Sequence, residues 1–78
     1  MGLFSKQNSV TCPQCRMNFE TASIPIDHAE DHVRSEPTPL GTRFTWDCCG
    51  GPGGSWEDVS PAAAGLLVHW WQVHGVPM

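Results

Sequence analysis

The residues of this chain that could carry chemistry are four cysteines and four histidines, and they fall into two clusters. In each cluster two thiols are followed by two imidazoles. The first cluster consists of Cys12, Cys15, His28 and His32, and the second consists of Cys48, Cys49, His69 and His74. Thiolate sulfur and imidazole nitrogen are the ligands that zinc prefers in closed structural sites. Both clusters are therefore candidate metal sites.

The spacing of the first cluster suits a single zinc ion. Cys12 and Cys15 are three residues apart and can point at one ion from a tight turn, and His28 and His32 are four residues apart, on one face of a helix. The apolar side chains between the two pairs are too few to fold a unit of this size without metal. We therefore predict one structural Zn²⁺ at this cluster, and a second at the other cluster stays open.

In ligand spacing, and in Phe19 after the cysteine pair, the stretch from Val10 to Val33 resembles the classical C2H2 zinc-finger family. This resemblance implies a ββα fold, made of a short hairpin and one helix, with the four residues of the first cluster as zinc ligands. Two readings stay open beside it. Cys12 and Cys15 could form a disulfide, and the two histidines could be exposed helix residues at chance spacing.

Pro25 departs from the family pattern, which usually has a leucine three residues before the first histidine. Proline is tolerated in the first turn of a helix. The sequence therefore predicts a helix that begins near Ser23 or Ile24, with Ser23 as its N-cap, and runs to about Arg34.

The second cluster departs from this spacing in both of its pairs. Adjacent side chains in a strand point to opposite faces, so Cys48 and Cys49 could chelate one ion only from a strained turn. His69 and His74 lie about 140° apart on a regular helix. The pattern favours a degenerate unit held by tryptophan packing, while a second complete zinc site and an all-thiolate site stay open. The all-thiolate site would join Cys12, Cys15, Cys48 and Cys49.

The elements that must position the second cluster can be predicted from its flanks. Phe44 and Trp46 alternate with polar residues as in a strand, Gly50 to Gly54 read as a turn or flexible loop, and Trp56 resumes apolar character. Ser60-Pro61 predicts a helix start and Gly75 a helix end. We expect a hairpin followed by a helix over 61–74.

Together these signals predict a small, zinc-stabilised α+β protein: a ββα zinc finger followed by a hairpin and a C-terminal helix. The expected divisions are a flexible tail at 1–9, a C2H2-like finger at 10–35, a proline-rich linker at 36–41, and a second hairpin-helix unit at 42–78, which could be a degenerate or second finger.

The last predicted helix offers an apolar face for a partner. At 100° per residue one face collects Ala63, Leu66, Leu67, Trp70, Val73 and His74, with Trp71 at its margin and Val68 nearly opposite. Because tryptophan is enriched at interface hot spots, we assign partner binding to Trp70, Trp71 and Val68. The partner would be another protein or a second copy of the chain.

Composition and charge exclude other classes. The net charge of −4 opposes attraction to nucleic acid or anionic lipid. No catalytic motif accompanies the thiols, so we do not expect an enzyme. We expect a cytoplasmic protein, or a subunit of a larger intracellular or virion assembly, that acts as a zinc-finger adaptor. The alternative is a nucleic-acid-associated regulator of a bacterium or phage, with contacts from Lys6, Arg16, Arg34 and Arg43.

Overall fold

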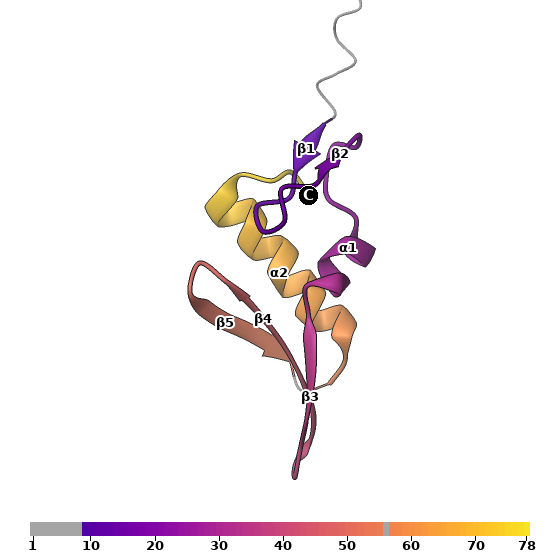
Figure 1. The fold of residues 1–78 in the computed structure, drawn as a ribbon, viewed down its shortest axis with the longest axis vertical. Helices are drawn as coiled ribbons and strands as arrows, with labels where there is room; N and C mark the ends of the chain where they lie inside the picture. The colour runs from indigo at the N-terminus through magenta and orange to yellow at the C-terminus, as the bar shows by residue number, and fades with distance from the viewer. Residues whose placement is uncertain (1–8, 56) are drawn as a thin grey trace, which may run out of the picture.

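The computed structural model describes residues 9–55 and 57–78, which form two antiparallel sheets and two helices (Figure 1). The expected tail at 1–8, the nucleic-acid contact expected of Lys6 and the expectation for Trp56 lie outside the described residues. The elements in chain order are β1 (Val10–Thr11), β2 (Asn18–Phe19), α1 (Ile26–Asp31), β3 (Arg34–Thr38), β4 (Gly41–Cys48), β5 (Gly51–Ser55) and α2 (Val59–His74). The prediction of a small α+β protein with a C-terminal helix is confirmed.

The helix α1 is shorter than the sequence predicts at both ends. It begins at Ile26 with Pro25 as the N-cap, and no side chain caps it, so the predicted start at Ser23 or Ile24 is wrong. A residue that precedes proline is disfavoured in helical conformation, and Ile24 is in that position. At the other end His32 is the C-cap. Arg34, predicted to be helical, instead begins β3 and pairs with Thr45.

The segment predicted as a proline-rich linker contributes to the larger sheet. β3 pairs with β4 from Arg34–Thr45 to Thr38–Gly41, and β4 pairs with β5, giving the order β3-β4-β5. Pro37 is compatible with this because β3 is an edge strand. The turn between β3 and β4 lies at the end of the molecule opposite β1 and β2 (Figure 1).

The glycine-rich run is mostly a strand and not the predicted loop. β5 pairs with β4 up to Cys48–Gly51, so the turn is reduced to Cys49 and Gly50. Gly53 lies opposite Trp46, and a Cβ atom there would overlap the indole ring. The glycine thus makes room for a tryptophan that packs partly buried against the core.

The helix α2 ends where the sequence predicts, but it begins two residues earlier. It begins at Val59, and its N-cap is Asp58, whose carboxylate accepts a hydrogen bond from the Val59 backbone N–H at 2.6 Å. The expected N-cap Ser60 is already inside the helix. Gly75 ends the helix in the left-handed conformation at φ 74°, as predicted.

One core joins the two halves of the chain. Its buried members come from the cysteine turns, from the two helices and from residues just before α1 and just after α2: Cys12, Ile24, Ala29, Cys48, Ala63, Leu66, Trp70 and Val76. Trp70 is the largest, with 0% of its surface exposed. The assignment of Trp70 to a partner-binding surface is therefore corrected, because its indole fills the core. Val73 and His74 of the predicted apolar face are instead exposed.

Of the two other residues assigned to partner binding, Trp71 is 50% exposed and Val68 is partly buried. Neither helix in the described part of the chain is long and apolar enough to cross a membrane.

Candidate metal centres

The first cysteine pair is held by the turn between β1 and β2. Cys12 directly follows β1, and its backbone N–H donates to the Met17 carbonyl at 2.9 Å while its own carbonyl accepts from the Arg16 N–H at 2.9 Å. Arg16 takes a left-handed conformation with φ 65°. These two bonds close a compact loop, which brings the side chains of Cys12 and Cys15 to the same side.

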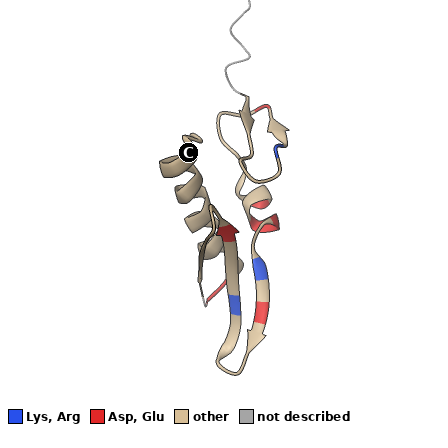
Figure 2. Cartoon of the chain, turned by 60° about the vertical axis from the view of Figure 1, so that its left-hand side comes forward, with Lys and Arg blue, Asp and Glu red and all other residues tan. Residues whose placement is uncertain are grey.

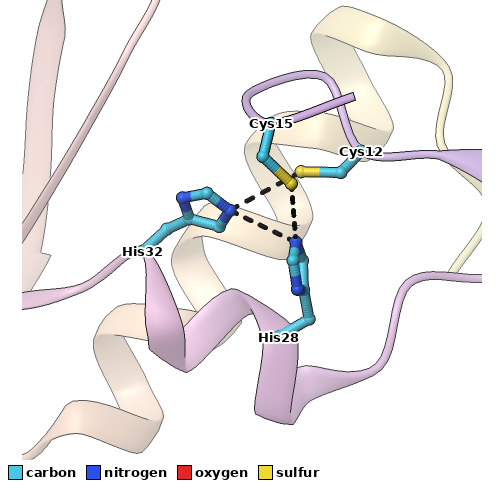
Figure 3. Close-up of side chains that lie close together, drawn as sticks. All are labelled: Cys12, Cys15, His28 and His32. Atoms are coloured by element: carbon cyan, nitrogen blue, oxygen red, sulfur yellow. Dashed lines mark hydrogen bonds between the residues drawn. The ribbon is translucent and has the colours of Figure 1, made fainter. Parts of the chain in front are cut away.

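The helix α1 supplies the two histidines of the first centre. His28 is in α1 and His32 caps its C-terminus, one turn later, so that both rings face the cysteine turn (Figure 3). The Cys12 Sγ atom lies 3.7 Å from Nε2 of His32, and the Cys15 Sγ atom lies 3.2 Å from Nε2 of His28. The two Nε2 atoms are 3.2 Å apart.

These distances match the edges of a tetrahedron around zinc. With Zn–S and Zn–N bonds of about 2.3 and 2.0–2.1 Å, neighbouring ligand atoms should be separated by about 3.3 to 3.8 Å. Four donor atoms that point at one another leave lone pairs unsatisfied, which a cation at their centre would satisfy. The predicted first cluster is thus brought together as a set that could hold zinc. The thiols are free, so the alternative disulfide between Cys12 and Cys15 is absent.

The second cysteine pair occupies the turn between β4 and β5. Cys48 is the last residue of β4, and Cys49 and Gly50 form a two-residue turn in which both φ angles are positive, 62° and 77°. That is the φ pattern of a type I′ hairpin turn, whose first central position is usually Asn, Asp or Gly. The strained turn required by adjacent ligands is therefore present, and it brings the two sulfurs within 4.0 Å.

The helix α2 supplies the histidines of the second centre from its last two turns. Nε2 of His74 lies 3.5 Å from the Cys48 sulfur and 3.2 Å from the Cys49 sulfur. The ring of His69 contacts that of His74, with 5.4 Å between centroids, and packs on Trp46 at 5.3 Å. Nε2 of His69 is buried and makes no hydrogen bond within the described residues.

The second set is thus complete, against the expectation of a degenerate unit. One ligand atom from each of its four residues lies within 4.8 Å of the others, as in the first set. The adjacency of the two cysteines argued against one shared ion, but the left-handed conformation of Cys49 brings both sulfurs to the same side. Each thiol pair is grouped with the histidines of its own half, whereas the alternative all-thiolate site would have excluded them.

Burial sets the electrostatics of both centres. It raises the pKa of the Cys12 thiol, an effect that backbone N–H groups of the turn partly offset. It also raises the pKa of Cys48, where the Trp70 indole opposes the rise and the neighbouring thiols Cys49 and Cys12 add to it. The pKa of His32 is lowered, first by burial and then by His28. His32 therefore stays in the neutral form that binds metal, while metal binding must displace protons from the thiols.

Four protein ligands in each set would fill all positions of a tetrahedral zinc ion. A catalytic zinc keeps one position for water or substrate. The arrangement is therefore suited to holding structure and not to activating a bound molecule.

No protein-family model matches this chain, and no curated protein or solved structure matches it either. The resemblance of the stretch from Val10 to Val33 to C2H2 zinc fingers stays a prediction from ligand spacing. The conclusion that the two Cys2His2 sets could hold a metal such as zinc rests on their geometry alone.

Proposed function

We propose that this protein is a non-enzymatic, zinc-stabilised adaptor that binds another protein through the exposed side of α2. Two closed sets of four ligands support the zinc-stabilised part of this proposal. They also speak against catalysis at the metal, because neither set offers an open coordination position. The metals would serve to present the surface of α2 in a fixed shape.

The observation that carries the proposed binding surface is Trp71, a tryptophan 50% exposed on a helix without a single charged residue. Val68 lies one turn before it and the exposed Ala64 two turns before it, on the same side of the helix. The charged residues of the described chain fall on other segments, including α1, β3 and β4, as Figure 2 shows. Uncharged surface around a tryptophan is typical of the centre of a protein interface.

The test is the substitution Trp71→Ser, with Leu40→Ser as the matched control. Leu40 is also a large apolar side chain, 88% exposed, but it lies next to the turn between β3 and β4 and not on α2. A photo-crosslinker placed at Ala64, which is exposed on the same side of α2 as Trp71, identifies the partner in expressing cells, and sedimentation velocity measures self-association. The affinity of the purified pair is then measured for each variant.

We expect Trp71→Ser to weaken association at least tenfold, as removal of a hot-spot residue does, and Leu40→Ser to leave it unchanged. A Trp71→Ser variant that loses folding stability but associates normally would place Trp71 in a structural role and contradict the proposal. Binding to mixed-sequence DNA that weakens steeply with salt would instead favour the nucleic-acid regulator. The net charge of −4 argues against that result.

A further inference from the structure

The two candidate metal centres share one buried residue, Trp70. Its ring meets that of the ligand His32 edge-on, with 5.7 Å between centroids and 82° between planes. The same indole acts to lower the pKa of the Cys48 thiol of the second centre against the rise caused by burial, although its Nε1 makes no hydrogen bond within the described residues. Cys12 and Cys48 are buried in the same cluster as Trp70. A single close-packed group of side chains therefore touches ligands of both centres.

A hydrogen bond also joins the two cysteine turns directly. Gln14 lies between the two cysteines of the first turn, and its Nε2 donates to the backbone carbonyl of Asp47 at 3.0 Å. Asp47 is the residue immediately before Cys48. The oxygen of the same side-chain amide, Oε1, is buried and has no hydrogen bond among the described residues. This side chain is thus held in place by its contact with the opposite turn.

The helices that carry the histidines pack on each other as well. α1 carries His28 and ends at His32, and α2 carries His69 and His74. α1 and α2 are in contact, and the Ser60 hydroxyl at the start of α2 donates to the Glu30 carboxylate of α1 at 3.3 Å. Movement of either helix would therefore displace the histidines of one centre. It would also disturb the helix that carries the histidines of the other centre.

We infer that the two metal centres bind zinc cooperatively, with Trp70 and Gln14 as the positioning residues that couple them. This inference rests on the proposed zinc-stabilised function. The physical reason is that metal affinity in so small a domain includes the free energy of ordering the chain. Zinc in one centre orders the shared core, so the second zinc binds to a site already formed and loses less conformational entropy. The chain should pass from empty to doubly loaded with little of the singly loaded form.

The first measurement is native mass spectrometry of the full chain during titration with zinc. Two independent sites, equal or unequal, give a singly loaded fraction of about half or more at half saturation. Positive coupling reduces that fraction below the value that the two separate site affinities would give, and below half when those affinities are equal. With a coupling of about tenfold, within the usual range for linked sites, the empty and doubly loaded forms should dominate.

Two variants, each lacking one ligand of one centre, measure the effect of that centre on metal binding at the other. His28→Ala removes a ligand of the first centre, and Cys49→Ala removes one of the second. The affinity of each remaining centre for Co²⁺, followed by its visible absorption, should be lower than the affinity of the same centre in the wild type by about tenfold. Linkage requires the factor to be the same in both directions.

The variant Gln14→Met tests the direct link between the turns, because it keeps the length of the side chain but removes the hydrogen bond to Asp47. The control is Asn18→Ala in the same hairpin, whose side chain contacts Thr11 at 3.5 Å and nothing in the second half that the structure records. We expect Gln14→Met to raise the singly loaded fraction toward half and Asn18→Ala to leave it as in the wild type. An unchanged fraction in Gln14→Met would overturn the role of Gln14.

A centre that binds Co²⁺ with the same affinity in the wild type as in the variant that lacks the other centre would overturn the coupling. That result would leave the proposed zinc-stabilised function standing. Failure of the chain to bind zinc at all would remove both, so the two failures are distinguishable. Trp70→Phe, which keeps an aromatic ring in the core, provides a second variant with reduced coupling if it folds with both metals.

Discussion

At the scale of single residues, the most informative one is Cys49. A non-glycine residue with φ near 62° is unusual, and the left-handed region costs an L-residue about 1 kcal/mol or more. Glycine, asparagine or aspartate would fit this position of the turn more easily. A cysteine there places its sulfur within 4.0 Å of that of Cys48 and 3.2 Å from His74. A metal held between them would account for the backbone conformation.

Two substitutions of Cys49 separate the loss of the metal ligand from the relief of backbone strain. Cys49→Gly and Cys49→Ala both remove the sulfur, so both should bind one zinc instead of two. Cys49→Gly should be more stable than Cys49→Ala by about 1 kcal/mol, because glycine adopts the left-handed conformation without a steric penalty. Urea denaturation of the two singly loaded variants measures the difference. Equal stabilities would show that the turn is not strained in solution.

At the scale of elements, the strand β5 depends on its neighbour across the sheet. Gly53 leaves space for the Trp46 indole, which packs on the ligand His69. A glycine-rich strand is weak by itself. Its conformation is therefore maintained by pairing with β4 and by contact with α2.

Alanine substitutions in β5 should accordingly differ by position. Gly53→Ala places a methyl group in the space of the Trp46 ring and should destabilise the protein by about 1–3 kcal/mol, as overpacked sites do. It should also weaken zinc binding at the second centre by displacing His69. The control is Gly51→Ala, where a Cβ atom meets nothing within 4 Å. Thermal unfolding and metal titration of both variants check the prediction, and similar losses at the two positions would refute it.

At the scale of the whole molecule, a small apolar core depends on eight candidate metal ligands. The buried core holds few large side chains, chiefly Trp70 and Leu66. Domains of this size often need a staple beyond hydrophobic burial. One set connects the hairpin of β1 and β2 to α1, the other connects the turn between β4 and β5 to α2, and each contributes a cysteine to the core.

The stability of the loaded protein should therefore depend on pH through proton competition. Burial raises the pKa of Cys12 and Cys48, so zinc must displace a proton from each thiol at neutral pH. The logarithm of the zinc affinity of each centre should fall by about two per pH unit from pH ~8 to pH ~6.5, and more steeply below, where imidazoles also protonate.

The first centre should enter this steeper range at lower pH than an ordinary site, because burial lowers the pKa of His32. Since zinc binds the folded chain, its contribution to stability is present at high pH and is lost as the pH falls. Competition with a chelating dye over this range measures the slope. A zinc affinity that does not change with pH would be incompatible with thiolate ligation.

Much of this protein is already determined by residue types and spacing. The eight ligands are identifiable as two groups because few other residues bind zinc, and Cys12, Cys15, His28 and His32 have a spacing that local geometry can satisfy. Gly75 ends α2 because glycine adopts the left-handed conformation readily. The strand around Phe44 and Trp46 follows from alternation. These are local properties, decided within a few residues.

The tertiary structure alone decided the rest. A left-handed cysteine in a two-residue turn completes the second metal set, and only strand pairing between β4 and β5 requires that turn. Pairing of β4 with β3 makes part of the expected linker a strand, and pairing of β4 with β5 does the same for the glycine run. Trp70 and Trp71 are neighbours of identical type, yet one is buried and the other half exposed. Their difference depends on which face of α2 meets α1 and the sheet, because burial is set by contacts between segments distant in sequence.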